Sequence, residues 1–182
     1  MRKSREEAAQ TRRRIVEAAS CEFRRCGIVA TGLNDLMKAA GLTHGGFYKH
    51  FASKDQLVTE ATTAALDAML EEMAAHPTTG AAVAAYLSTR HRDNPGSGCP
   101  LAAIGSELSR SDRQAREAAT AGFVRLVDIL AGKAGTADAR RRALVAAATL
   151  IGAMTNSRMV TDPNLSVAIL QEAEGSLTAA RS

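Results

Sequence analysis

The sequence predicts an all-α fold of about nine helices, and three observations carry that prediction. Aromatic residues make up 3% of the 182 residues and Trp is absent, whereas strands favour aromatic and β-branched side chains. Alanine, the residue with the highest helix propensity, recurs along the whole chain. Apolar residues recur at steps of three and four, the spacing that places them on one face of a helix. We therefore expect a small helical head followed by a larger helical body.

The first predicted helix runs from about Glu6 to Arg25. Its apolar stripe consists of Ile15, Ala18, Ala19, Phe23 and Cys26. Cys21 and Cys26 are interpreted as buried packing residues of this helix. Gly27 is expected to end it, because glycine tolerates the left-handed conformation that often follows a helix.

Two short helices follow, separated by a tight turn. Thr31 is expected to cap the second helix, and residues 41–42 form the break after it. Thr43 is expected to cap a third helix, which reaches about Phe51 and buries Phe47 together with Phe51. Three helices with a short turn between the second and the third are the plan of a helix-turn-helix.

The rest of the chain predicts the helices of the body. Ser53 and Gln56 form a capping box for a helix that runs to about His76. The other predicted elements are helices at residues 81–90, 100–110, 112–131, 137–159 and 163–179, a loop at 92–98 and a turn at 132–135. Pro100 suits the first position of its helix, and Ser111 is expected to cap the next. The helix at 137–159 is apolar on most of its circumference, so we expect a partner subunit to cover part of it.

Charge is distributed unevenly between the two predicted domains. Residues 1–54 carry a net charge of +6 and residues 55–182 a net charge of −2, within a total of +4. A basic head on a slightly acidic body is expected when one end of a protein meets phosphates. Residues 1–54 are therefore predicted to form a DNA-binding domain.

The third predicted helix is the candidate reading element. If Phe47 and Phe51 are buried, then His44, Gly45, Tyr48 and Lys49 lie on the opposite face, where side chains near a helix N-terminus reach base edges in the major groove. Neighbouring polar residues are placed to contact phosphates. The predicted DNA contacts are Thr31, Asn34, Thr43, His44, Gly45, Tyr48, Lys49, His50 and Lys54.

Residues 10–58 resemble the TetR family of bacterial regulators. The matching motifs are Thr31, the turn Ala40-Gly41-Leu42-Thr43, the pair Phe47-Tyr48, and Phe51-Ala52-Ser53-Lys54. Gly45-Gly46 departs from the family pattern, in which the first of these positions is commonly larger or polar. The resemblance implies a homodimer held through the last two helices and a near-palindromic operator. It also implies a small-molecule effector bound in the body, and a repressor that leaves the DNA when that effector binds.

An effector pocket is expected among apolar residues of the body. Its candidate lining residues are Met69, Met73, Tyr86, Cys99, Leu101, Ile104, Phe123, Val127 and Met154. The same residues also suit a plain hydrophobic core. Cys99 precedes a helix, where the macrodipole favours a thiolate, so a repressor that senses electrophiles or oxidants through Cys99 is an alternative.

Two further alternatives are a DNA-binding protein without an effector and a thiol enzyme. The enzyme is not favoured, because no His or acid is placed in the sequence to activate Cys99. No metal site and no cofactor are predicted. The chain has no apolar stretch of 18 residues, no signal-peptide pattern and only three cysteines, so we expect a cytoplasmic protein that does not contact a membrane.

Overall fold

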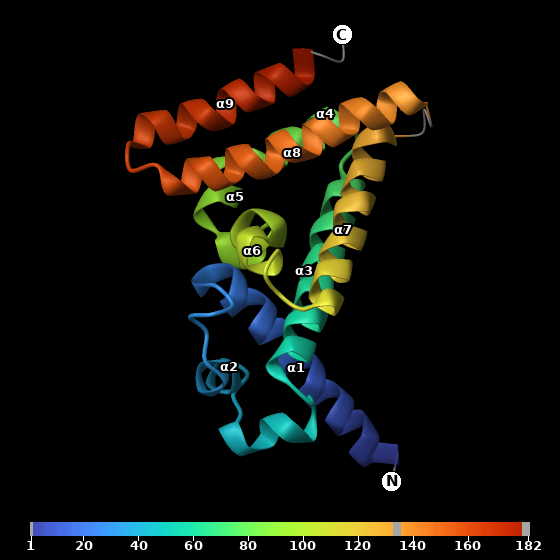
Figure 1. The fold of residues 1–182 in the computed structure, drawn as a ribbon, viewed down its shortest axis with the longest axis vertical. Coiled ribbons are helices and arrows are strands. Elements are labelled where there is room, and N and C mark those ends of the chain that lie inside the picture. The colour runs from blue at the N-terminus through green and yellow to red at the C-terminus, as the bar shows by residue number, and fades with distance from the viewer. Residues whose placement is uncertain (1, 133–135, 180–182) are drawn as a thin grey trace.

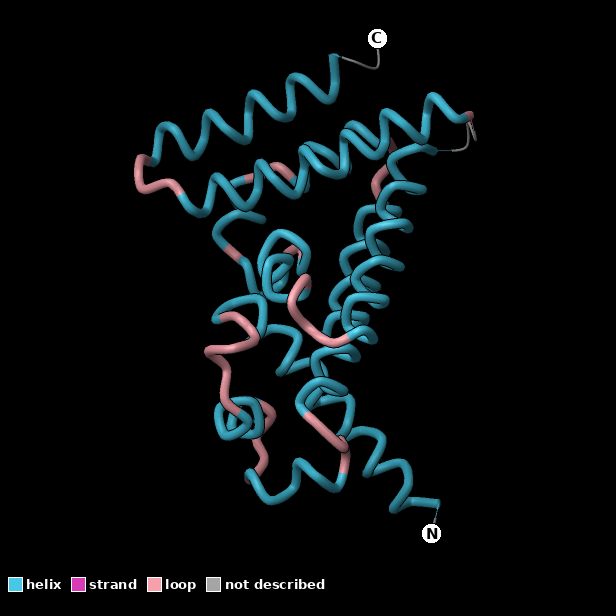
Figure 2. The backbone as a smooth tube through the Cα atoms, in the orientation of Figure 1, coloured by secondary structure: helices cyan, strands magenta, loops and turns pink. Residues whose placement is uncertain are grey.

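The computed structural model describes residues 2–132 and 136–179, and within these ranges it consists of helices joined by loops, without a strand (Figure 2). The described part contains nine α-helices and two 3-10 segments: α1 (Arg2–Cys26), α2 (Leu33–Ala39), η1 (His44–Lys49), α3 (Lys54–Ala75), α4 (Thr79–Tyr86), α5 (Thr89–Asp93), η2 (Pro95–Ser97), α6 (Pro100–Leu108), α7 (Arg113–Ala131), α8 (Ala137–Met159) and α9 (Pro163–Ala179). The predicted all-α class is confirmed. No helix of the described residues is long and apolar enough to cross a membrane.

The helices form a head and a body whose cores share residues of α3, α6 and α7 (Figure 1). α1, α2 and η1 lie at one end, α8 and α9 lie at the other, and α3 runs between them alongside α7. α3 contributes Leu57 and Val58 to the core of the head, and Leu66 and Leu70 to the core of the body. α6 also reaches into the head, because Ile104 and Leu108 belong to its core. The predicted domain boundary, between residues 54 and 55, falls at the start of α3, but the core of the head extends across it.

Several helix ends follow directly from local sequence. Gly27 has a φ of +90°, as a residue ending a helix in the left-handed conformation requires. The Ser53 hydroxyl accepts from Gln56 N–H at 3.1 Å, and the Gln56 amide oxygen accepts from Ala52 N–H at 2.8 Å. Pro100 occupies the first turn of α6. The predicted bounds of α8 and α9 are confirmed, whereas residues 133–135 of the predicted 132–135 turn lie outside the described residues.

Three predicted helix caps are wrong. Thr43 precedes η1 without a side-chain cap hydrogen bond, and the other two hydroxyls bond to a carbonyl earlier in the chain. Thr31 donates to the Gly27 carbonyl at 2.5 Å, and Gly32 begins α2 without a side-chain cap. Ser111 donates to the Glu107 carbonyl at 3.0 Å, while Asp112 caps α7 by accepting from Ala115 N–H. Ser and Thr hydroxyls can donate to a carbonyl at the end of the preceding helix as well as accept from an N–H of the following one.

Three other predictions are corrected. The helix expected at 81–90 is divided into α4 and α5, because the Ser88 hydroxyl accepts from His91 N–H and starts a new helix. The third helix is the 3-10 segment η1, which ends at Lys49 instead of reaching Phe51. Cys21 and Cys26 are exposed on α1 instead of buried.

Candidate functional site

η1 is a short segment held on the head by one buried ring. The turn before it has Gly41 at a φ of +69°, and Leu42 N–H bonds back to the Met37 carbonyl at 2.8 Å. The Phe47 side chain is 0% exposed, and its ring stacks on Phe51 with centroids 5.6 Å apart. Two consecutive glycines disfavour a full α-helix here, so the packing of Phe47 fixes the orientation of η1.

The face of η1 opposite Phe47 is open. Tyr48 is 66% exposed, and its ring meets Phe47 edge-on with centroids 5.1 Å apart. His44, Gly45 and Lys49 are exposed as well, and a Cβ at Gly45 would meet nothing within 4 Å. Thr43 at the start of η1 and Asn34 on α2 are also exposed, while His50 is half-buried. The structure thus gathers six of the nine predicted DNA contacts on the exposed surface of α2 and η1.

Two of the residues predicted to contact DNA make hydrogen bonds within the head. Thr31 is buried, and its hydroxyl bonds the end of α1. The Lys54 ammonium donates to the carbonyls of Ile28 and Thr31, at 2.6 and 2.7 Å. Lys54 therefore ties the α1–α2 loop to the start of α3, and this tertiary contact leaves no signal in the local sequence.

Two arginines of α1 bond the segments before and after η1, and neither contact was predicted from the sequence. The Arg12 guanidinium lies 4.1 Å from the centroid of the Phe51 ring, bonds the His50 carbonyl and pairs with Glu60. Arg14 donates to the Ala40 carbonyl at 2.6 Å, at the end of α2. Cations commonly satisfy the free carbonyls at helix ends.

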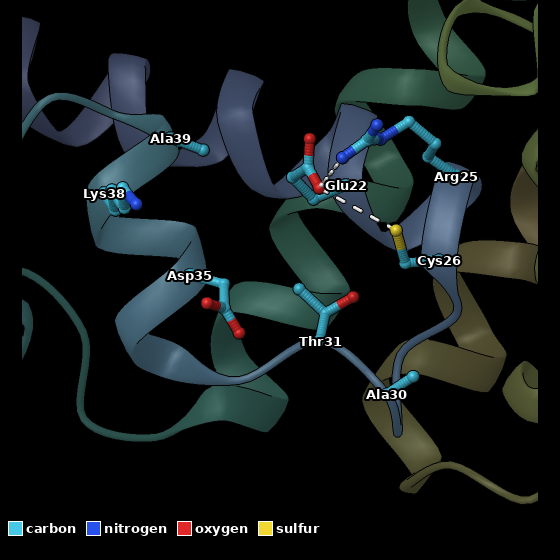
Figure 3. A pocket seen from close by; sticks show the side chains of 8 residues that line it. All are labelled: Glu22, Arg25, Cys26, Ala30, Thr31, Asp35, Lys38 and Ala39. Atoms are coloured by element: carbon cyan, nitrogen blue, oxygen red, sulfur yellow. Dashed lines mark hydrogen bonds and ion pairs between the residues drawn. The ribbon is translucent and has the colours of Figure 1, made fainter.

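A cleft of about 480 Å³ lies between the end of α1 and α2 (Figure 3). Its charged lining residues are Glu22, Arg25, Asp35 and Lys38. The Cys26 sulfur lies 3.9 Å from a Glu22 carboxylate oxygen, and Arg25 pairs with the same oxygen at 3.0 Å. The two signs of charge balance within the cleft, so it does not concentrate positive charge as a phosphate site would.

The body contains a cleft of about 510 Å³, which we call the body cleft. It is bounded by α3, α4, α5 and the loop around η2. Its lining residues are Met69, Glu72, Met73, His76, Ala82, Ala85, Tyr86, Ser88, Arg90, His91, Asn94, Ser97 and Gly98. Three of the nine predicted pocket residues, Met69, Met73 and Tyr86, are among them.

The other predicted pocket residues lie elsewhere. Leu101 and Phe123 line a separate groove of about 310 Å³ between α6 and α7. The remaining four are buried in cores, Ile104 in the head and Cys99, Val127 and Met154 in the body. The polar lining residues were not predictable from the sequence, because an apolar pattern shows burial but not which polar side chains face a cavity.

His91 makes two hydrogen bonds at the edge of the body cleft. Its Nδ1–H donates to the Tyr86 carbonyl at 2.6 Å, and its Nε2 atom accepts from Cys99 N–H at 2.8 Å. This pair of bonds requires the neutral ring, with the proton on Nδ1. Burial lowers the pKa of His91, the Tyr86 carbonyl opposes that shift, and the Arg158 charge adds to it.

Cys99 does not have the environment of a reactive thiol. Its side chain is fully buried, and burial raises the pKa of the thiol. The expected effect of the helix N-terminus is therefore outweighed by desolvation. His91 bonds the Cys99 backbone, and its Nε2 atom is not free to take the thiol proton.

The head matches known regulators. Residues 15–61 match the family described as bacterial regulatory proteins, tetR family. The transcriptional regulator TtgR of Pseudomonas putida is 43% identical over 58 residues, which span 32% of this chain and 28% of TtgR. The probable acrEF/envCD operon repressor of Escherichia coli K12 is 39% identical over 59 residues, which span 32% of this chain and 27% of the repressor.

Solved structures match nearly the whole chain. Reduced NemR of E. coli has a TM-score of 0.76 at 19% identity, covering 92% of this chain and 95% of NemR. A TetR regulator from Chloroflexus aurantiacus has a TM-score of 0.70 at 26% identity, covering 98% and 96% of the two chains. Residues 15–61 thus match the TetR family of bacterial regulatory proteins, and the chain as a whole shares the fold of a solved TetR regulator.

Proposed function

We propose that this chain is a transcriptional repressor that binds a near-palindromic operator and releases it when a small molecule binds the body. The main support is the exposed face of η1. Because Phe47 is fully buried, the opposite face of η1 points to solvent, and it does so on a basic head. Side chains on such a face can enter the major groove, with Lys49 on a phosphate and Tyr48 and His44 beside the bases.

The body cleft supports the effector part of the proposal. Its volume of about 510 Å³ lies in the range of small-molecule sites. Its lining combines apolar side chains such as Met69 and Met73 with polar and charged ones. A structural neighbour, described as a SmeT–triclosan complex, has a TM-score of 0.60 at 21% identity, covering 94% of this chain and 91% of that one. That complex supports a small-molecule site here by analogy in fold alone.

Exposed apolar side chains on α8 and α9 support a homodimer. On α8, Val145 is 62% exposed and Met159 is 70% exposed, and Leu144 of α8 and Leu165 of α9 are also exposed. A second copy packed on these helices would remove them from water. A two-fold dimer would place two heads on successive major grooves, which is why we expect a near-palindromic operator.

Variants of η1 test the DNA-binding part. Lys49→Ala is expected to weaken operator binding and to reduce the slope of log Kobs against log salt concentration by about 1, because one phosphate contact is lost. Tyr48→Ala is expected to weaken binding with the slope unchanged. Fluorescence anisotropy titrations at several salt concentrations measure both effects.

Arg125→Ala is the matched control. Arg125 is an exposed cation on α7 that pairs with Asp67 of α3, so it belongs neither to η1 nor to the proposed dimer surface on α8 and α9. We expect this variant to bind with the affinity and salt slope of the wild type. If both η1 variants bound like Arg125→Ala, the exposed face of η1 would not be the reading surface.

A further inference from the structure

The body cleft and the head are joined through the start of α6. His91 on α5 and Gly98 both line the body cleft. His91 holds the Cys99 N–H, and the preceding Gly98 carbonyl accepts from Arg24 of α1 at 2.8 Å. Arg24 is itself fixed by the Ser20 carbonyl and hydroxyl, at 2.9 and 3.1 Å. The chain just before α6 therefore bonds the body on one side and α1 of the head on the other.

The far end of α6 makes a second contact with the head. A carboxylate oxygen of Glu107 accepts from Val29 N–H at 2.8 Å, in the loop that leads from α1 to α2. The same carboxylate fills the space beside Gly27, where a Cβ would lie 2.8 Å from its other oxygen. A displacement of α6 would therefore act on the loop that precedes the helix-turn-helix.

We infer that His91 is a proton-sensitive latch that couples the body cleft to the head: neutral His91 holds the start of α6, and protonation of its Nε2 atom releases it. This coupling deepens the proposed function and rests on it in one respect, since the head is taken to be the part that reads DNA.

The chemistry of the latch follows from the donors and acceptors involved. When Nε2 takes a proton from solvent, an N–H faces the Cys99 N–H, so two donors are opposed and the hydrogen bond is lost. The buried Cys99 N–H then has no hydrogen-bond partner, and an unsatisfied buried donor lowers the stability of this arrangement. Because His91 and Gly98 line the body cleft, a bound small molecule would lie beside the same bond.

The groups around His91 favour the neutral ring at neutral pH. Its charged and titratable neighbours on the packed elements are Glu72 of α3, Tyr86 of α4, Cys99, Arg24 of α1 and Arg158 of α8. The two arginines oppose protonation, Glu72 favours it, and Tyr86 and Cys99 are neutral at that pH. Since the pKa of folded His91 is lowered from 6.5, the unfolded chain binds the proton more readily. The stability that neutral His91 confers is thus complete above 6.5 and declines as pH falls toward the folded pKa.

An NMR titration of the backbone amides tests the latch on the full chain without DNA. The amide signals of Cys99 and Val29 and the ring signals of His91 would be followed from about pH 7.5 to about pH 5, above the range in which most carboxylates titrate. In the wild type we expect all three to shift with one common midpoint below 6.5. The head carries two further histidines, His44 and His50, so operator affinity alone would not isolate the effect.

Three variants separate the latch from a structural role. His91→Gln keeps an acceptor near the Nε2 position but does not titrate, so the shifts of Cys99 and Val29 should disappear. His91→Phe keeps the ring without nitrogen, so both amides should stay at the positions of the protonated wild type at every pH. His76→Gln changes another histidine of the body cleft, so the signals of Cys99, Val29 and His91 should shift as they do in the wild type. If His91→Phe does not fold, the wild type, His91→Gln and His76→Gln still test whether His91 controls the two amide signals.

Two results would overturn the inference. One is a Val29 amide that does not follow the His91 midpoint, because the latch would then not reach the head. The other is an unchanged titration in His91→Gln. Neither result bears on operator binding at pH 7.5, which is measured separately, so the latch and the proposed function can fail independently.

Discussion

Replacing Phe47 with alanine is expected to destabilise the head by about 3–5 kcal/mol, the usual cost of removing a fully buried phenylalanine. The Phe47 ring is 0% exposed and packs on Phe51 and Tyr48. η1 has two glycines and only six residues, and Phe47 is the one that is buried, so this ring supplies most of its apolar packing. Such a loss is comparable with the whole stability of a small domain, and operator binding should be lost with it.

Urea denaturation followed by circular dichroism measures this effect, and Tyr48→Ala is the matched control. Tyr48 is the next residue of η1 but is 66% exposed, so its removal should cost less than about 1 kcal/mol. A Phe47→Ala protein within about 1 kcal/mol of the wild type would show that the Phe47 ring does not hold η1.

Gly98→Ala is expected to have the second largest effect, a destabilisation of about 1–3 kcal/mol from overpacking. A Cβ at Gly98 would lie 2.4 Å from both Nε2 and Cδ2 of His91, and 3.1 Å from an Arg158 nitrogen. The φ of Gly98 is −86°, which alanine adopts readily, so the cost is steric and not a matter of backbone strain. His91 would have to move, and the bond from Cys99 N–H would be lost.

Gly105→Ala, within α6, serves as the comparison. An added Cβ there would meet nothing within 4 Å, so we expect a midpoint of thermal unfolding close to that of the wild type. Equal melting temperatures for Gly98→Ala and Gly105→Ala would mean that His91 tolerates displacement and does not hold the start of α6.

Features that depend on a few neighbouring residues were predictable from the sequence. Gly27 ends α1, Ser53 and Gln56 bond across the start of α3, and Pro100 opens α6. The bounds of α8 and α9 follow from long apolar patterns between clear helix signals. The burial of Phe47 and the exposure of Tyr48 also follow, because a spacing of four residues between Phe47 and Phe51 puts both rings on one face.

Features that depend on contacts between distant segments were not predictable. The Thr31 hydroxyl could cap α2 or bond the end of α1, and only the path of the loop decides between them. Lys54 is a plausible phosphate ligand until its ammonium is seen to bond two carbonyls from the α1–α2 loop. The predicted pocket divided between a cleft, a groove and two cores, since apolar periodicity does not distinguish residues that line a cavity from residues that fill a core.

The central claim is that the head reads a two-fold-symmetric operator, and selection from a pool of random DNA duplexes tests it most directly. The purified wild-type chain should enrich a near-palindrome with half-sites one helical turn, about 34 Å, apart. Lys49→Ala, selected in parallel, should enrich it less. A wild-type chain that retains duplexes no more strongly than Lys49→Ala, with no symmetric sequence enriched even at low salt, would contradict the claim.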